Sequence, residues 1–516
     1  MSASTRRLLL LLVLVLVLGA QYLHRRSAHP AAGPASADSS PDSLRRGTVL
    51  LQRCEIGRRG IAGVGTSSAY CTRLAVPEDW NAPSGRQIAL RVAIVRSAAV
   101  RSDPDPVVFL DGGPGSAATE DYPAIAPALA LLRERRDILL VDQRGTGGSN
   151  ALACTTDSDA DPPTAALPGS RDMAASLQRV QQCLASVRTH ATPEHYTTSD
   201  AIRDLEAIRQ ALGAPPLDLI GVSYGTRVAQ QYAARYPGSV RSVVLDSTVP
   251  NTLALGSDHA RNLERVLQSL FARCSADDPC RQSFGDSYAT LYHLRDELRA
   301  RPQSLTLRDP FTYQPLHLEF SADDLSAIVR INAYNPITAA LLPLTLYQAD
   351  HGNYAPLLSQ KKWISDDLGS EITGGMELSV VCAEDADLLS SRPEDATTLL
   401  GNEQIAKIQS ACSAWPRGDR PADFHRPFAS ALPVLILAGQ YDPVTPPGYG
   451  AELLRTLSNA RLLLAPGQGH AVIGAGCMPR LVRQFIDELK PRALDDRCLL
   501  QLGDIPAFID FNGSTP

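Results

Sequence analysis

Six short runs rich in Val, Leu and Ile recur along this chain of 516 residues, without the regular alternation of apolar and polar positions that marks a half-exposed strand. Such runs are typical of strands buried on both faces of a parallel sheet. Because helical patterns separate several of them, the sequence predicts an α/β fold, with a mostly parallel central sheet and helices on both faces. Functional sites in such sheets lie outside the carboxyl ends of the strands. The runs are 107–110, 138–141, 217–220, 240–245, 434–437 and 462–464.

The stretch 199–212 is a clear example of the helical patterns. Its sequence is SDAIRDLEAIRQAL, and its main apolar side chains fall on one side, at Ile202, Leu205, Ile208 and Leu212. Ser199 is placed to cap the start of this helix, and Gly213 is placed to end it.

Two stretches depart from the alternation of strand and helix. Residues 72–96 contain two strand patterns around a turn-rich segment, which predicts a leading antiparallel hairpin. Residues 250–430 have weaker strand patterns and several amphipathic helical segments, and the sheet pattern resumes after them, which predicts an inserted, mainly helical cap. The expected organisation is therefore a signal and leader at 1–44, an α/β core at 45–249 and 431–516, and the cap at 250–430.

The N-terminus predicts export. Arg6 and Arg7 precede the run Leu8–Ala20, which is made almost wholly of Leu and Val. Thirteen such residues suit the apolar region of an export signal and are short for a membrane span. Residues 25–42, rich in Ala, Pro and Ser, look like a flexible leader. We expect a secreted or periplasmic protein, with an uncleaved N-terminal anchor as the open alternative.

Ten cysteines, an even number, all follow the predicted signal. In an exported chain this indicates about five disulfides. No CxxC pair and no HExxH pattern accompanies them, so we expect no metal site. Spacing does not settle the connectivity, and the first expectation is that each cysteine pairs with its sequence neighbour, as Cys54–Cys71, Cys154–Cys183, Cys274–Cys280, Cys382–Cys412 and Cys477–Cys498.

Composition excludes some kinds of partner. The chain is 44% hydrophobic and 20% charged, with a net charge of −6 and no basic run outside the extreme N-terminus. A nucleic-acid partner is therefore not expected. A chain of this length and composition can bury a large core, and its oligomeric state stays open.

The run 217–220 leads through Gly221, Val222, Ser223, Tyr224 and Gly225 into a helical pattern at 226–235. A serine on so sharp a strand-to-helix turn needs glycine two residues away on both sides, because a Cβ there would collide with a neighbouring element. The turn lifts Oγ clear of the backbone, at a helix N-terminus that favours developing negative charge. Ser223 is the candidate nucleophile, and an ordinary strand-to-helix turn is the alternative.

A serine hydroxyl is a weak nucleophile until a base takes its proton, and the base needs a carboxylate to hold its tautomer. His470 follows the run 462–464 and is the candidate base, whereas His425 precedes a strand and would lie at the wrong end of the sheet. Asp442 follows the run 434–437 and is the candidate acid. The alternative acid, Asp246, is expected instead to accept hydrogen bonds from loop backbone.

A tetrahedral oxyanion needs donors that are already aimed at it. We expect one to be the backbone N–H of Tyr224, the residue after the nucleophile. The other is expected from the loop after 107–110, which reads DGGPGS, with Gly113 as the candidate. A phosphate-binding role for this loop is disfavoured, because no Lys follows in P-loop spacing.

Several motifs together resemble a known family. They are VPEDW at 76–80, GGPGS at 112–116, DQRGTGGS at 142–149, GVSYGT at 221–226 and CAED at 382–385, followed by the late Asp442 and His470. The chain is similar, over about residues 65–500, to secreted α/β-hydrolase serine peptidases of the prolyl aminopeptidase and tripeptidyl aminopeptidase group. It is most like the tripeptidyl branch, including that branch's C-terminal segment. One departure is Asp111, where many relatives have His.

The resemblance implies an α/β-hydrolase fold, no cofactor, and release of tripeptides or single residues such as Pro from peptides with a free N-terminus. Such an enzyme must neutralise the substrate's α-ammonium group, and Glu384, with Asp385 as runner-up, occupies the family-like position for this. The alternative is that both are acids beside a disulfide at Cys382. Arg144 is expected to form structural hydrogen bonds.

Two other functions remain open from the sequence. One is an esterase or lipase that uses the same three residues, and the other is a non-catalytic exported binding protein on a hydrolase scaffold. The number of residues released and any preference for proline also stay open, because the shape of the cap decides them.

Overall fold

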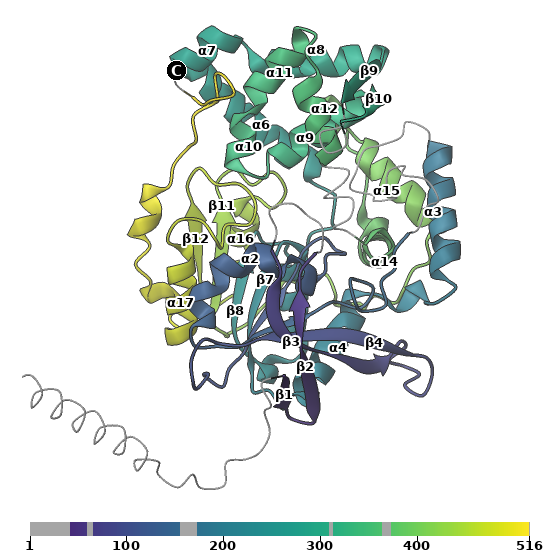
Figure 1. Cartoon of the computed structure of the whole chain (residues 1–516), viewed down its shortest axis with the longest axis vertical. Helices are drawn as coiled ribbons and strands as arrows, with labels where there is room; N and C mark the ends of the chain where they lie inside the picture. The colour runs from purple at the N-terminus through teal and green to yellow at the C-terminus, as the bar shows by residue number, and fades with distance from the viewer. Residues whose placement is uncertain (1–41, 59–64, 155–172, 309–312, 364–372, 515–516) are drawn as a thin grey trace, which may run out of the picture.

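A ten-stranded sheet forms the centre of the molecule, which we describe from a computed structural model covering residues 42–58, 65–154, 173–308, 313–363 and 373–514 (Figure 1). The strand order is β1-β2-β3-β4-β6-β5-β7-β8-β11-β12. The strands are β1 (Ser43–Arg46), β2 (Val49–Ile56), β3 (Ser67–Pro77), β4 (Gln87–Val95), β5 (Val107–Leu110), β6 (Ile138–Val141), β7 (Leu217–Val222), β8 (Val240–Asp246), β11 (Val434–Gly439) and β12 (Ala460–Ala465).

The six apolar runs of the sequence all form strands, β5, β6, β7, β8, β11 and β12, and all of these pair in parallel. The predicted hairpin at 72–96 is β3 with β4, which is antiparallel. Two strands of this sheet, β1 and β2, were not predicted. They pair with each other, and β1 begins at Ser43, inside the expected leader. The predicted export signal lies outside the described residues.

Helices cover both faces of the sheet, as predicted. In β5, Val108 and Leu110 join one cluster of buried residues, whereas Val107 and Phe109 join another. Because successive side chains of a strand point to opposite faces, the two clusters are the two faces of the sheet. The first includes side chains of α4 (Thr198–Ala211) and α5 (Tyr224–Arg235), and the second those of α2 (Ala118–Arg133) and α17 (Met478–Glu488).

The predicted helix at 199–212 is α4, and its N-cap differs from the prediction. The side chain of Thr197 accepts a hydrogen bond from the backbone N–H of Asp200 and caps the helix, whereas Ser199 lies inside the first turn. The prediction for Ser199 was wrong because Thr197, two residues earlier, already has the extended backbone that a cap requires. Gly213, with φ of +60°, follows the helix end as expected.

In the described part of residues 250–430, the structure contains helices and a two-stranded sheet, and these helices divide into two groups. The first group, with β9 and β10, lies at one end of the molecule (Figure 1), and its buried side chains form one large cluster and a small one around α7. The last two, α14 and α15, contribute instead to a cluster of the main core. The elements are α6 (His259–Ala276), α7 (Asp278–Phe284), α8 (Ser287–Ala300), β9 (Gln303–Arg308), β10 (Pro315–Phe320), α9 (Ala322–Asn332), α10 (Pro336–Ala340), α11 (Leu342–Asp350), α12 (Ala355–Trp363), α14 (Gly374–Glu384) and α15 (Glu403–Ala414).

Because α14 and α15 pack with the main core, the boundaries of the cap at 250 and 430 stay a prediction. A helix from the first part of the chain, α3 (Met173–Val187), packs against α15, so the end of the inserted stretch is in contact with the core.

The ten cysteines form five disulfides, and each joins the sequence neighbours that were predicted. The first expectation, that each cysteine pairs with its neighbour along the chain, is thus confirmed. Among the described residues, no helix combines the length and the apolar composition that a membrane span requires.

Candidate active site

Ser223 lies between β7 and α5 with φ of +55° and ψ of −123°, a backbone conformation that residues other than glycine rarely adopt. A Cβ at Gly225 would overlap the carbonyl oxygen of Leu110 at the end of β5, and a Cβ at Gly221 would overlap that of Gly225. The two glycines therefore allow the helix to start directly against the neighbouring strand. This is the steric reason from which the turn was predicted.

Asp442 and His470 are in contact. Asp442 follows β11 and is fully buried, and its Oδ2 lies 2.8 Å from Nδ1 of His470, which follows β12. Oδ1 of Asp442 accepts hydrogen bonds from the backbone N–H groups of Val444 and Thr445, and the Thr445 hydroxyl donates to Oδ2 at 2.8 Å. These contacts hold the carboxylate in one orientation.

The pKa values of this pair move in opposite directions. Burial alone would raise the pKa of Asp442, but the charge and hydrogen bond of His470, with the backbone donors, lower it below its ordinary value. Burial alone would lower the pKa of His470, but the charge and hydrogen bond of Asp442 outweigh it and raise that pKa. The result is an ionised Asp442 beside a ring whose basicity is increased. With the proton on Nδ1 directed to Asp442, Nε2 is the free acceptor.

Asp246 does not contact the ring through a hydrogen bond and instead holds the loop that carries it. Its carboxylate accepts hydrogen bonds from the N–H groups of Val472 at 3.0 Å and Ile473 at 2.8 Å. Its carbonyl oxygen accepts one from the N–H of Ser223 at 3.0 Å. Asp246 thus links the loop after β12 to the turn after β7, which agrees with the backbone role expected from the sequence.

The described residues show no hydrogen bond between His470 and Oγ of Ser223. Hydrogen bonds between a catalytic base and its nucleophile are often long in substrate-free enzymes and shorten when substrate binds. What brings the two residues to the same edge of the sheet is the parallel pairing of β7, β8, β11 and β12, since the loops that carry them all follow carboxyl ends of these strands.

Tyr334 is a residue of this site that sequence reasoning missed. It follows α9, its carbonyl oxygen accepts a hydrogen bond from the N–H of His470 at 2.8 Å, and its ring lies 5.0 Å from the imidazole, centre to centre. An element of the stretch 250–430 therefore contacts the candidate base directly. No local motif marks Tyr334, and only the folded arrangement reveals it.

The loop 111–116 lies against the turn at Ser223. A Cβ added to Gly112 would lie 3.3 Å from Cβ of Ser223, and Gly113 has φ of +101°, which favours glycine. The N–H of Tyr224 belongs to the first turn of α5, where backbone donors have no acceptor within the helix. The loop 111–116 and the start of α5 thus both adjoin Ser223, and the N–H groups of Gly113 and Tyr224 stay the predicted donors.

Glu384 and Asp385 lie at the end of α14, and both are buried with partners from the protein itself. Oε1 of Glu384 accepts from the N–H of Thr198 at 2.6 Å, and Oε2 accepts from its hydroxyl at 2.9 Å. Oδ2 of Asp385 forms an ion pair with Nη1 of Arg227 at 2.8 Å. Recognition of a substrate amine by either acid stays a prediction.

Burial raises the pKa of Glu384 to about 8, with the nearby Asp385 adding to the shift and Arg227 opposing it. The carboxyl group is therefore mostly neutral at pH 7. Thr198, which binds it, also has its hydroxyl 2.6 Å from the phenol oxygen of Tyr224. Glu384 thus belongs to a buried network that ends at the residue next to Ser223.

The other candidate base, His425, lies away from Asp442. Its Nδ1 is 2.7 Å from the carbonyl oxygen of Asn251, and its Nε2 is 2.8 Å from that of Glu384. The ring therefore connects backbone segments around the end of α14.

Arg144 has the structural surroundings expected of it. It is fully buried, and it donates two hydrogen bonds to the carboxylate of Asp204, at 2.7 and 2.6 Å. The indole N–H of Trp80 binds the same carboxylate at 3.0 Å. Two motifs distant in sequence, VPEDW and DQRGTGGS, therefore meet in one buried network.

Comparison with known proteins identifies the family. Residues 105–474 match the family described as "alpha/beta hydrolase fold". Serine protease Hip1 of Mycobacterium tuberculosis is 25% identical over 448 residues, which cover 81% of this chain and 85% of that protein. Carboxylesterase B of the same species is 25% identical over 460 residues, which cover 82% and 85%.

The tripeptidyl aminopeptidase of Streptomyces coelicolor is 32% identical over 197 residues, which cover 35% of each chain. The resemblance to serine peptidases found in the sequence motifs is thus confirmed by relatives that cover most of the chain as well as by this shorter match. With the family match extending from β5 to beyond His470, this chain is a serine hydrolase and belongs to the alpha/beta-hydrolase family.

Proposed function

We propose that the protein is an exported serine exopeptidase, which releases short N-terminal pieces from peptides through an acyl-enzyme on Ser223. The observation that carries the proposal is the contact between Asp442 and His470, 2.8 Å apart, at the edge of the sheet where the turn at Ser223 also lies. An alcohol, a carboxylate and an imidazole, in this order along the chain at Ser223, Asp442 and His470, are the groups that such chemistry requires.

In the proposed reaction, Nε2 of His470 takes the proton of Ser223 as Oγ attacks the scissile carbonyl carbon. The carbonyl oxygen becomes an oxyanion that the N–H groups of Gly113 and Tyr224 stabilise. Each such donor contributes roughly 2.7–4 kcal/mol of barrier lowering. The imidazolium, held by Asp442, then returns the proton to the leaving amine. Water attacks the acyl-enzyme by the same route and releases the N-terminal piece.

The peptide substrate is proposed on two grounds. The relatives include a serine protease and a tripeptidyl aminopeptidase by name. In addition, Tyr334 from the stretch 250–430 lies against His470, so this stretch contributes to the surroundings of the proposed base, where a peptide would have to bind. The five disulfides support export, because disulfides persist in oxidising compartments.

An esterase is the second candidate, because Carboxylesterase B matches 82% of the chain. Three substrates separate the two functions: a tripeptidyl amide with a free amine, the same amide acetylated at its N-terminus, and a short-chain ester. Loss of a charge-assisted contact costs about 1.5–3 kcal/mol. We therefore expect acetylation to lower kcat/KM at least about tenfold. Equal rates for the free and acetylated amides, or turnover of the ester alone, would contradict the exopeptidase proposal.

Substitution of Glu384 by glutamine separates its structural role from amine recognition. Because the folded protein holds a proton on Glu384 up to about pH 8, and an unfolded glutamate loses it near pH 4.5, the wild type should lose stability as pH rises between these values. Glu384→Gln keeps an acceptor for the N–H of Thr198 and cannot ionise. We expect the variant to equal the wild type near pH 5 and to be more stable at pH 9.

Denaturant unfolding of both proteins at pH 5 and pH 9 measures this difference, since all other titrating groups are shared. The kinetic control is KM for the free-amine tripeptidyl amide at pH 7. If the variant shows no relative gain in stability at pH 9 and its KM rises more than about tenfold, Glu384 recognises the substrate amine rather than holding Thr198.

A further inference from the structure

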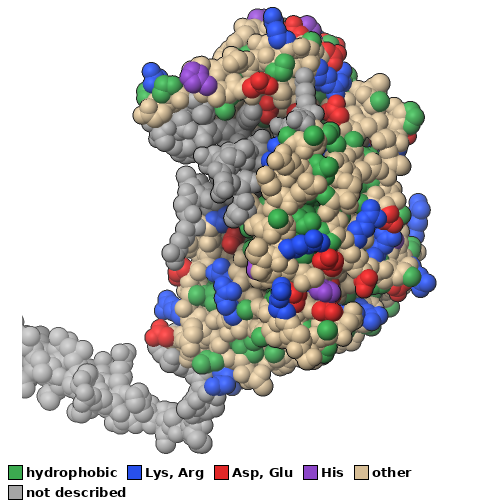
Figure 2. Space-filling model, turned by 90° about the vertical axis from the view of Figure 1, so that its right-hand side faces the viewer, with side chains coloured by type: hydrophobic (Ala, Val, Ile, Leu, Met, Phe, Trp, Pro, Cys, Tyr) green, Lys and Arg blue, Asp and Glu red, His purple; other side chains and the backbone are tan. Residues whose placement is uncertain are grey.

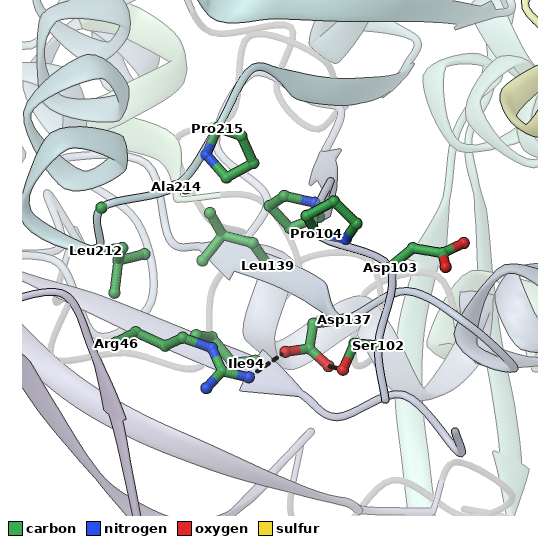
Figure 3. Close-up of a pocket in the computed structure, with 12 residues that line it drawn as sticks. Arg46, Ile94, Ser102, Asp103, Pro104, Asp137, Leu139, Leu212, Ala214 and Pro215 are labelled. Carbon is green, nitrogen blue, oxygen red and sulfur yellow. Dashed lines mark hydrogen bonds and ion pairs between the residues drawn. The ribbon is translucent and has the colours of Figure 1, made fainter. Parts of the chain in front are cut away.

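Basic and acidic side chains are interspersed over the face of the molecule shown in Figure 2. In the cavity of Figure 3, too, positive and negative side chains lie together, and its charged groups are paired. Arg46 donates to Oδ2 of Asp137 at 2.8 Å, and the hydroxyl of Ser102 donates to Oδ1. Asp103, on the same wall, is paired with Arg135 at 3.0 Å. This cavity therefore has no spare charge to offer a ligand.

A second cavity, of about 380 Å³, differs because its arginines have no acidic partner in an ion pair among the described residues. It lies between the first turn of α4, the last turn of α5 and the loop 421–429. Arg203, Arg235 and Arg426 line it, one from each element, and among the described residues none of the three has an ion pair. We call it the arginine cavity.

The wall of the arginine cavity has one acidic side chain, Asp423, beside the three arginines. Three guanidinium groups and one carboxylate leave a net formal charge of +2. Arg203 is half-exposed and Arg235 and Arg426 are exposed, so solvent reaches all three, and their excess positive charge attracts an anion to the cavity. Burial raises the pKa of the nearby Asp200 in α4, and the charge of Arg203 opposes that shift only in part.

Two further features of the wall suit an anion. Ser199, in the first turn of α4, lines the cavity, and its hydroxyl can donate a hydrogen bond to an anion. Asn251 is 3% exposed, and its buried Oδ1 has no hydrogen-bond partner in the described part of the chain. Asn251 lines the cavity as well, and an amide NH₂ group can donate hydrogen bonds to an anion.

We propose that the arginine cavity binds a small phosphate monoester, with its dianionic phosphoryl group among Arg203, Arg235 and Arg426. Planar guanidinium groups bind tetrahedral oxyanions through two parallel hydrogen bonds. The net charge of +2 that the three arginines and Asp423 leave matches the charge of a dianion. This site is separate from the proposed chemistry at Ser223. None of the three arginines contacts Ser223, Asp442 or His470 through a hydrogen bond or ion pair in the described residues.

Calorimetric titration of the full chain with inorganic phosphate and with glycerol 3-phosphate tests the proposal. The test variant is Arg203→Gln/Arg235→Gln/Arg426→Gln. The control variant is Arg261→Gln/Arg281→Gln/Arg497→Gln, which removes the same charge from three surface arginines that already have acidic partners. Hydrolysis of the tripeptidyl amide by every protein checks that the variants are folded.

We expect each probe to bind the wild type and the control variant with equal affinity. The test variant should bind each probe at least about a hundredfold more weakly, because each lost charge-assisted contact lowers the affinity about tenfold. Equal binding of a probe to all three proteins would overturn the proposal. So would the absence of any heat of binding when the wild type is titrated to about 10 mM phosphate, a concentration roughly tenfold above a dissociation constant of about 1 mM.

Discussion

Replacement of Ser223 by alanine should lower kcat for a tripeptidyl amide by about a millionfold, because nucleophile, base and acid act as one unit and the loss of the nucleophile removes the whole covalent route. Alanine lacks only Oγ, and it meets the same backbone requirement as serine at φ of +55°. The fold should therefore be preserved. Single-turnover and steady-state assays of the purified variant measure the effect.

The control for this result is His470→Ala. If the groups act as a unit, its loss should be of similar size, and the double variant should be no worse than either single one. Additive losses would mean that the two residues act independently. A Ser223→Ala enzyme that retained more than about one hundredth of its activity would show that another residue carries the acyl group.

Replacement of Asp442 by asparagine should lower kcat by about ten-thousandfold. The amide can still accept the N–H groups of Val444 and Thr445 at Oδ1, so the loop keeps its shape. Its other end, however, would present an NH₂ donor to Nδ1 of His470, which stabilises the wrong tautomer and removes the charge that raises the ring's pKa.

The pH profile is the second readout of this variant. Because His470 must be neutral to accept a proton and its pKa is raised, kcat/KM of the wild type should rise with pH through a midpoint above about 6.5, the ordinary histidine value. In Asp442→Asn that midpoint should move to lower pH. An unchanged midpoint would separate Asp442 from the base.

Asp246→Asn is the matched comparison, since Asp246 is the other buried aspartate near the ring. Asparagine keeps one acceptor for the two backbone N–H groups of Val472 and Ile473, so we expect a much smaller loss of kcat than in Asp442→Asn. A larger loss in Asp246→Asn would transfer the role of the acid to that residue.

Local chemistry explains why much of the fold could be predicted from the sequence. The strands β5 and β6 match their apolar runs, because a strand buried on both faces admits few polar residues and its ends coincide with the change in composition. The turn at Ser223 was predictable because steric contacts at Gly221 and Gly225 exclude side chains. The disulfides follow the simplest pairing, in which each cysteine is joined to its neighbour along the chain.

What escaped prediction depends on contacts between distant segments. Ser199 and Thr197 are both favourable capping residues by type, with Ser the better of the two, and the backbone of the preceding loop decides for Thr197. Tyr334 contacts His470 only because α9 folds back over the sheet edge. The hydrogen bonds from Thr198 to Glu384 join α4 to α14, and no spacing in the sequence announces them.

Labelling with a fluorophosphonate, followed by mass spectrometry of the digested protein, tests the central claim most directly. Such a probe reacts with a serine only when a base and an oxyanion site have activated it. The wild type should carry one equivalent of probe on the peptide that contains Ser223, and both Ser223→Ala and His470→Ala should remain unlabelled there. Label on a different residue of the wild type, or an unlabelled wild type that still hydrolyses the tripeptidyl amide, would contradict the assignment of Ser223 as the nucleophile.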